Sequence, residues 1–378
     1  MTQTTPRRLE SLDTLRGLIM VLMALDHASF FVARTHPFEF WSIPLPDYGG
    51  SASWFLTRWV THFCAPGFFF LMGAGMALFS AARLEAGWSA QRITRHFLLR
   101  GLLLIPVFYC LEAPIWVVGM GGLGNGGRTS FIVFTVLVTL GVSMILAAPL
   151  LRLSSRSWLA MAFIAIMAPN FLIPTLIKHG GDVGFIMRAF VVPGETYPIS
   201  AMYPILPWFG ICALGVGFGQ LVQRNRDRAL RAMLPMGLAY LIAFVGVRVG
   251  GGFGNLREAS GAGWIPFLTV VKYPPSLAFC LVTLGGNFTL LSLFHRAGAW
   301  FDAIKRVLSV FGQAPLFFYL AHLYVYMLMR FVFFPQTSGP QWVLYPSWLA
   351  GVALLYPACL WYRRFKASKP DGSLWRMF

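Results

Sequence analysis

The chain has 378 residues, of which 57% are hydrophobic and only 11% are charged, and its mean hydropathy is +0.67. A soluble domain carries about 25% charged residues, so this composition excludes a water-soluble globular protein and predicts a membrane protein. A net charge of +17 would suggest nucleic acid as the partner of a soluble protein. Here the basic residues lie in short connections between apolar runs, so no nucleic acid is expected.

Ten apolar runs approach the length of about 20 residues that a helix needs to cross a bilayer. They predict an all-α, polytopic integral membrane protein of about ten transmembrane helices, folded as a single domain over 1–378. We expect helices at about 15–33, 55–82, 97–111, 129–151, 157–177, 203–222, 231–249, 274–294, 308–333 and 342–362. The first run continues as a full span, so no removable signal peptide is expected. The five cysteines lie in or beside these runs and indicate no disulfide.

The basic residues alternate between the two sides of the predicted membrane. The N-terminus and every second loop hold most of the 30 Lys and Arg residues, which predicts that both termini are cytoplasmic. The expected location is the inner membrane. The longer loops, 34–54, 112–128, 178–202 and 250–273, fall on the other side and are rich in Gly, Pro and aromatic residues. We expect these loops to form a lid or vestibule. The alternative is that they are loose connectors.

The first predicted helix carries four ionisable residues, which are costly in a membrane and therefore functional candidates. Asp13 and Arg16 are three residues apart, share a face near the cytoplasmic end and can pair, for function or only for structure. Asp26 and His27 lie deeper, roughly 18 Å along the helix. His27 can act as a general base or simply pack two helices together. Side chains of adjacent residues point about 100° apart, so Asp26 need not orient His27.

Two further histidines fall at a similar depth. His62 lies in the second predicted helix, one turn after Arg58 on the same face, and Pro66 then bends or loosens that helix. His322 lies in the ninth. Together with His27 they predict a buried polar chamber. They could also hold a metal, but no metal-ligand spacing is present and none is expected. Arg58 could alternatively be an interfacial anchor.

Two further patterns are a pair of glycines and a group of three arginines. Gly215 and Gly219 form a GxxxG motif, which favours close helix packing. Arg16, Arg95 and Arg100 lie at the predicted cytoplasmic mouth, where arginines can hold phosphates, although every positive-inside loop offers arginines.

Four segments resemble bacterial proteins that are similar to heparan-α-glucosaminide N-acetyltransferase, within the wider transmembrane acyltransferases. They span most of the chain and are Arg8–Gly17 with Met23–His27, Thr57–Pro66 with Phe68–Gly73, Tyr203–Gly210, and Gly312–His322. The resemblance implies transfer of an acetyl group from cytosolic acetyl-CoA to a hydroxyl or amine of an extracytoplasmic acceptor, expected to be a sugar.

The resemblance also implies roles for the candidate residues. His27 would be the general base and Asp26 would support it. Arg58, His62 or His322 would stabilise the oxyanion or hold the acceptor, and Arg16, with Asp13 beside it, Arg95 and Arg100 would meet the CoA phosphates. In the animal lysosomal branch the position resembling His27 is similar to an Asn, and the catalytic histidine follows in the next loop. His36 is therefore the second candidate base, and an acetyl-histidine intermediate stays open.

Two other functions remain open at this point. A proton-coupled secondary transporter could use the same His and Asp chamber as a relay, although no matching halves are visible in the sequence. A non-catalytic component of envelope biogenesis is the other alternative. The expected partners are acetyl-CoA, the acceptor and the lipid bilayer, with a homodimer left open.

Overall fold

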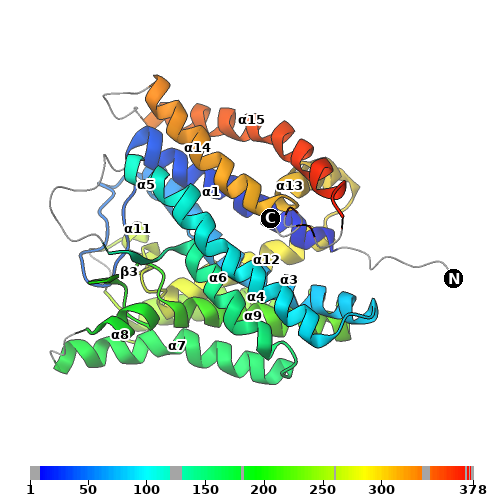
Figure 1. Ribbon diagram of the computed structural model, residues 1–378. Helices are drawn as coiled ribbons and strands as arrows, with labels where there is room; N and C mark the ends of the chain where they lie inside the picture. Colours follow the sequence, from blue (N-terminus) through cyan, green and yellow to red (C-terminus); the bar gives the residue numbers. More distant parts are fainter. Residues whose placement is uncertain are drawn as a thin grey trace.

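The computed structural model describes residues 9–119, 130–179, 183–258, 261–333, 341–370, 373 and 375. Figure 1 shows long helices running back and forth between two ends of a bundle, with α1 beginning and α15 ending at the same end. The helices are α1 (Glu10–Ala28), α2 (Ala52–Thr61), α3 (Cys64–Glu85), α4 (Ala90–Val107), α5 (Ala113–Gly119), α6 (Val136–Ala147), α7 (Ser155–His179), α8 (Phe185–Phe190), α9 (Ile205–Arg224), α10 (Arg226–Gly250), α11 (Trp264–Leu268), α12 (Leu277–Arg296), α13 (Asp302–Gly312), α14 (Pro315–Phe333) and α15 (Gln341–Ala367).

Short irregular helices extend several of these elements. The π-helical turns η1 (Ser29–Ala33) and η2 (Phe108–Glu112) continue α1 and α4, and the 3-10 turns η3 (Ala148–Leu150) and η4 (Ala299–Phe301) follow α6 and precede α13. Three strands, β1 (Ile132–Phe134), β2 (Gly194–Thr196) and β3 (Ile199–Ala201), form a small sheet in the order β1-β3-β2. β3 pairs in parallel with β1 and antiparallel with β2.

Nine helical segments in the described part of the chain are long and apolar enough to cross a membrane, each at the place of a predicted helix. They are Glu10–Ala33, Ala52–Glu85, Ala90–Gly119, Ser155–Lys178, Ile205–Arg224, Arg226–Gly250, Leu277–Arg296, Pro315–Phe333 and Trp342–Ala367. The remaining prediction, 129–151, is too long: only Val136–Leu150 is helical there, and Ile132–Phe134 pairs with β3 instead. The all-α polytopic class is confirmed.

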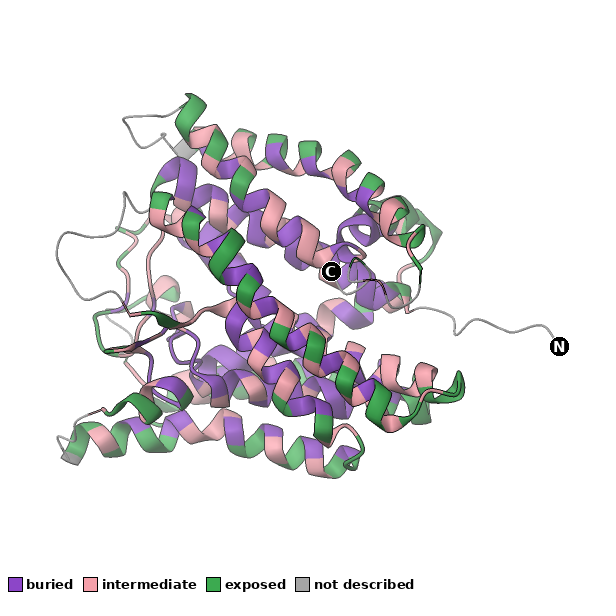
Figure 2. Cartoon of the chain, in the orientation of Figure 1, coloured by how far each residue is buried: buried purple, intermediate pink, exposed green. Residues whose placement is uncertain are grey.

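The outer faces of these helices are apolar and exposed. Figure 2 shows exposed and partly exposed residues along the outside of α7 and buried residues facing the bundle. On α7 and α10, Phe163 is 66% and Ile242 is 72% exposed. Large apolar side chains in water would be unfavourable over so wide a surface, so these faces are suited to lipid.

Two predicted boundaries are wrong. The third helix is longer than 97–111, because Ala90–Gly119 is helical through its basic first turns and through a π-helical turn just beyond Pro106. The prediction 308–333 joins two helices. α13 ends at Gly312 and α14 begins at Pro315, since proline has no N–H to continue a helix but fits its first turn.

The second span breaks close to the predicted place. α2 ends at Thr61 and α3 begins at Cys64. The break at His62 and Phe63 lies three to four residues before Pro66, which cannot donate to the carbonyl of His62. The Phe63 carbonyl accepts from Asn287 Nδ2 at 3.1 Å, so α12 supports the break.

Small residues bring α3 and α9 into contact. A Cβ at Gly215 would overlap the Phe70 carbonyl oxygen, and one at Gly219 would crowd the backbone of Ala74. Gly73 faces α9 in the same way, against the Cys212 carbonyl. The predicted role of the GxxxG motif in helix packing is therefore confirmed.

The described parts of the long loops gather at the end of the bundle opposite to the start of α1, at the left in Figure 1. Their backbones pair: Trp41 N donates to the Tyr273 carbonyl at 3.0 Å, and Lys272 N and Tyr273 N donate to the Glu39 carbonyl at 3.0 and 3.1 Å. The described parts of loops 34–54 and 250–273 are thus bonded to each other, so these two are not loose connectors. Residues 120–128 and 180–182 of the other two predicted loops lie outside the described residues.

Candidate active site

A cavity of about 390 Å³ opens where α1 ends and α2 begins, at the loop end of the bundle. We call it the outer cavity. It is lined by Asp26, Ser29, Arg34, Thr35, His36, Pro37, Asp47, Tyr48, Trp54, Thr57 and Arg58. Three of the predicted site residues, Asp26, His36 and Arg58, therefore share one cavity.

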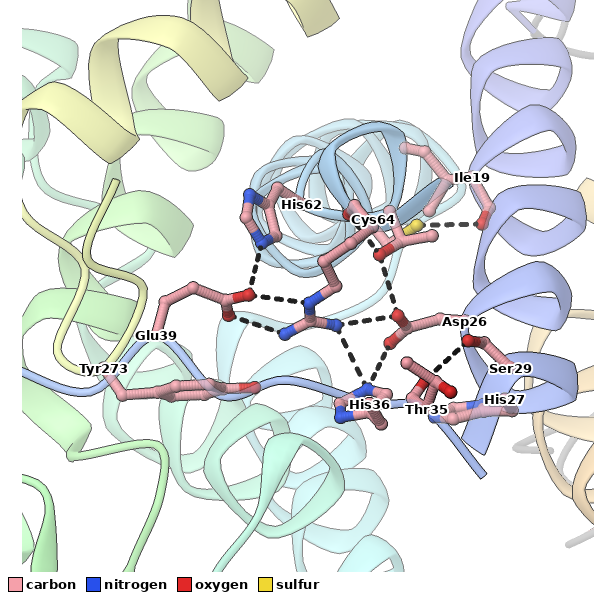
Figure 3. Close-up of polar contacts among 12 residues, drawn as sticks. Ile19, Asp26, His27, Ser29, Thr35, His36, Glu39, His62, Cys64 and Tyr273 are labelled. Carbon is pink, nitrogen blue, oxygen red and sulfur yellow. Dashed lines mark hydrogen bonds and ion pairs between the residues drawn. The ribbon is translucent and has the colours of Figure 1, made fainter. Parts of the chain in front are cut away.

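A polar cluster lies beside this cavity, and Figure 3 shows Asp26, His36 and Glu39 around one guanidinium group. That group belongs to Arg58, which is bonded to Asp26 and Glu39. Its Nε and Nη2 donate to the two carboxylate oxygens of Glu39 at 2.8 and 2.7 Å, and its Nη1 donates to Asp26 Oδ1 at 2.7 Å. Arg58 is 4% exposed and Glu39 is fully buried. A buried fork of this kind fixes both carboxylates in direction, so Arg58 is a structural organiser rather than an interfacial anchor.

Two side chains on one face of α2 bind Asp26. Arg58 and Thr61 are three residues apart and lie on one face, and Thr61 Oγ1 also donates to Asp26 Oδ1, at 2.8 Å. His62, at the end of α2, turns to Glu39, with Nε2 3.4 Å from Oε1. Arg58 and His62, which were predicted to share a helix face, therefore both lie beside Glu39.

His36 forms a dyad with Asp26. Its Nε2 lies 3.1 Å from Asp26 Oδ2 and 3.1 Å from Arg58 Nη1, and its side chain is 11% exposed. When Nε2 carries the proton and donates to Asp26, the lone pair remains on Nδ1, which is buried without a hydrogen-bond partner in the described part of the chain. Burial lowers the pKa of His36, and the carboxylate of Asp26 offsets part of that effect. Burial thus favours the neutral imidazole of His36.

Glu39 stays ionised despite its burial. Burial alone would raise the pKa of the Glu39 carboxyl, but Arg58 and His62 outweigh it and hold the pKa well below its usual range. The carboxylate oxygens of Glu39 accept hydrogen bonds from two of the three guanidinium nitrogens of Arg58. Asp26 accepts a hydrogen bond from the third nitrogen and also contacts His36.

His27 belongs to a second cluster. Its Nδ1 lies 2.6 Å from Nε2 of His322, whose Nδ1 is 2.9 Å from the Phe318 carbonyl oxygen. A carbonyl only accepts, so Nδ1 of His322 carries its hydrogen; in a neutral pair, His27 then donates from Nδ1 and keeps the lone pair on Nε2. Trp116 packs edge-on against His27, with ring centroids 5.3 Å apart.

The chamber of three histidines at one level is thus two adjoining clusters. Asp26, His36 and His62 lie around Arg58, whereas His27 and His322 pair with each other. Asp26 and His27 point to different partners, as their 100° separation on the helix predicts. Asp26 acts on His27 electrostatically, with no hydrogen bond between them among the described contacts, so the predicted support of His27 by Asp26 stays a prediction.

The inner end of the bundle carries the predicted phosphate-binding residues. Arg16 Nη1 donates to Asp13 Oδ1 at 2.9 Å and to the Gly312 carbonyl at 3.1 Å. Arg100, on α4, lies near enough to interact electrostatically with Arg16. Arg95 is exposed, and its position five residues before Arg100 puts it on a different face of α4. Arg16 and Arg100 therefore lie near each other, whereas Arg95 lies apart from them.

Two residues of the site were missed by sequence reasoning. Glu39 is a lone carboxylate in an apolar loop, three residues after His36, in a chain with only 13 acidic residues, and that scarcity could have drawn attention to it. Lys272 is 3% exposed, with Nζ 5.1 Å from the ring centroid of Tyr273. It acts electrostatically on His36, and no described carboxylate pairs with its ammonium group. No sequence pattern marks Lys272.

The described residues contain no group of three or more His, Cys, Asp or Glu side chains that could hold a metal ion. The absence of a metal stays a prediction.

A comparison with known proteins identifies the family of this chain. The family profile described as heparan-alpha-glucosaminide N-acetyltransferase, catalytic, matches residues 8–248, which include Asp26, His36, Glu39 and Arg58 but end before His322. A search of curated proteins gives no match. Because the matched region covers well over half of the chain, the protein belongs to the heparan-alpha-glucosaminide N-acetyltransferase catalytic family.

Proposed function

We propose that this protein is a membrane-embedded acetyltransferase that moves the acetyl group of cytosolic acetyl-CoA onto a hydroxyl or amine of a sugar acceptor on the non-cytoplasmic side of the inner membrane. Membership of the acetyltransferase family supports the reaction. The observation that carries the site is the His36–Asp26 dyad on the wall of the outer cavity. The acceptor would enter this cavity from the loop end.

His36 is the proposed general base. An acceptor O–H or N–H donates its proton to Nδ1 of His36, and the acceptor attacks the thioester carbonyl carbon. The tetrahedral intermediate collapses with cleavage of the C–S bond, and the thiolate of CoA takes the proton back from the imidazolium. Asp26 stabilises that imidazolium while it exists, as a charged partner 3.1 Å away.

Lys272 and His27 have supporting roles in this proposal. The buried ammonium of Lys272, which has no described carboxylate partner, is suited to stabilise the oxyanion of the intermediate. Arg58 is less suited, because Glu39 and Asp26 already engage all three of its nitrogens. His27, with a free lone pair on Nε2, can accept a hydrogen bond from the acceptor and position it. A covalent acetyl-histidine is not needed.

The donor would reach the site from the other end of the bundle. Arg16 and Arg100 are suited to hold the CoA phosphates at the cytoplasmic mouth. Arg16 and Asp26 are ten residues apart on α1, so about 15 Å of helix separates the phosphate site from the dyad. The pantetheine arm would lie along this length and bring the thioester to Asp26 and His36.

The test is an acetyl-transfer assay on purified protein in detergent, with acetyl-CoA and amino or neutral sugars as acceptors. Free CoA and acetylated sugar should appear in equal amounts. His36→Ala should lose about 10²- to 10⁴-fold in rate, which is the usual contribution of a general base. Sugar uptake into proteoliposomes without any consumption of acetyl-CoA would instead favour the transporter and contradict the proposal.

A further inference from the structure

A second cavity adjoins the outer cavity. It measures about 420 Å³ and lies between residues 45–50 and the segment 261–269. Asp47 and Tyr48 line both cavities, so the two share a wall. We call the second one the Trp264 cavity. Each is within the usual size range of a small-molecule site, and together they offer room for a ligand longer than one sugar ring.

Aromatic rings connect the two cavities. Tyr48 and Trp264 each contact Phe55 edge-on, with ring centroids 5.3 Å apart in both pairs. Trp264 is nevertheless 50% exposed, so much of its ring is open although it is anchored. An anchored, open aromatic face beside polar groups is suited to the apolar C–H face of a pyranose ring.

The backbone around this cavity is also open. Gly50 and Gly263 have φ angles of +72° and +115°, and a Cβ at either position would meet no other atom within 4 Å. Glycine leaves the peptide groups here uncovered, which lets hydroxyl groups approach them.

The charges of the two cavities differ. Among the described residues, Asp47 is the only charged one that lines the Trp264 cavity, whereas the outer cavity also contains Asp26, Arg34, His36 and Arg58. An acidic ring, such as a uronate or a sulfated sugar, would be repelled from Asp47, and a neutral or amino sugar would not.

We infer that the Trp264 cavity binds the second ring of an oligosaccharide acceptor, stacked on Trp264, and that it selects a neutral or amino sugar over an acidic one. The ring to be acetylated lies in the outer cavity against His36. This inference rests on the proposed function for the identity of the first ring. It adds that the acceptor has at least two sugar rings and that the second ring is a neutral or amino sugar.

The experiment measures binding by isothermal titration calorimetry on the full purified chain in detergent. The probes are glucosamine, its β1,4-linked disaccharide, and a disaccharide in which the second ring is glucuronic acid. The glucosamine disaccharide should bind at least about tenfold more tightly than glucosamine, and the glucuronate disaccharide should show no such gain. Trp264→Ala should remove the gain and leave the affinity for glucosamine unchanged.

Three controls sharpen the result. Trp264→Phe keeps an aromatic face and should keep part of the gain. Trp300→Ala removes a tryptophan that is 81% exposed at the opposite end of the bundle and should change nothing. Asp47→Asn retains the oxygen that accepts from Gly49 N, at 2.9 Å, and should raise the affinity for the glucuronate disaccharide.

Equal affinities of glucosamine and its disaccharide, a gain that survives Trp264→Ala, or no binding of either probe would overturn the inference. Failure of the proposed function has a different signature. In that case the disaccharide would bind through Trp264, but no CoA would be released from acetyl-CoA in its presence.

Discussion

At the scale of single residues, the chemistry at the loop end depends on how the Asp26 carboxylate is shared. Oδ1 accepts from Arg58 and Thr61, at 2.7 and 2.8 Å, and Oδ2 faces His36 at 3.1 Å. Arg58 and Thr61 hold the carboxylate in place, so that Oδ2 has a fixed direction toward the imidazole. A fixed carboxylate that orients a histidine and stabilises its protonated form is a recurring arrangement for a general base.

The first prediction tests this dyad. Asp26→Asn and His36→Ala should each lower the rate of acetyl transfer strongly, and the double variant should be little worse than His36→Ala alone, because the two side chains act as a unit. Rates of CoA release on the four proteins check this. His295→Ala, at the far end of α12, is the matched control and should leave the rate unchanged. Fully additive losses would contradict the dyad.

The second prediction concerns pH. A base works when neutral, and the pKa of His36 lies below 6.5, so the rate should be flat above about pH 7 and should fall only as the pH drops through this lowered pKa. Asp26 raises the pKa of His36, so Asp26→Asn should move the acid limb to lower pH as well as lowering the plateau. A pH–rate profile of both proteins measures this. A limb that moves to higher pH would contradict the assignment.

The third prediction concerns the oxyanion. Lys272→Met keeps the length and apolar stem of the side chain but removes the ammonium group. It should reduce kcat about 10²- to 10³-fold with little change in KM for the acceptor, since the charge is proposed to act on the intermediate. Lys369→Met is a control that removes a Lys from the far end of the chain. A rise in KM with unchanged kcat would show that Lys272 only binds substrate.

At the scale of elements, the site is assembled from segments that are distant in the chain. α1 contributes Asp26, the loop after it contributes His36 and Glu39, α2 contributes Arg58, and the segment before α12 holds that loop by backbone bonds from Lys272 and Tyr273. The break between α2 and α3 lets His62 approach Glu39. The stability of this region should therefore depend on Arg58 more than on any single helix.

The fourth prediction tests that dependence. Arg58→Ala leaves two buried carboxylates without their partner and should cost about 3–5 kcal/mol of stability. Arg58→Lys should recover only part of this, because an ammonium group cannot form the fork to Glu39 and also reach Asp26. Thermal unfolding in detergent measures both. Full stability of Arg58→Ala would show that the network contributes little.

The fifth prediction uses two glycines of α3. A Cβ at Gly73 would overlap the Cys212 carbonyl of α9, whereas a Cβ at Gly75 would meet no other atom. Gly73→Ala should therefore destabilise the protein by about 1–3 kcal/mol through overpacking, and Gly75→Ala should not. The shift in unfolding temperature of each variant measures this. Equal shifts would contradict the close α3–α9 contact.

At the scale of the whole molecule, apolar runs and loop charges predicted the bundle, because the bilayer imposes a length and a polarity that a sequence displays directly. The split at Pro315 was missed because apolar content does not distinguish one helix from two that meet. Asp26, His36 and Arg58 were identifiable as costly polar residues. The roles of Glu39 and Lys272 were not identifiable, since these residues lie in two loops, more than two hundred residues apart, whose backbones pair only in the folded chain.

The membrane gives this arrangement its proposed direction. α1 begins at the basic end, where Arg16 pairs with Asp13, and finishes at the outer cavity, where Asp26 meets His36. A single helix therefore links the proposed donor site and the proposed acceptor site. Acetyl-CoA and the sugar would approach from opposite sides and meet near Asp26.

Vectorial transfer in proteoliposomes tests this account most directly. Vesicles in which the cytoplasmic ends face inward are loaded with acetyl-CoA, and the glucosamine disaccharide is added outside. We predict acetylated disaccharide outside and an equal amount of free CoA inside, with both lost in His36→Ala. Product that forms only when acetyl-CoA and sugar are on the same side, or at an undiminished rate in His36→Ala, would contradict the account.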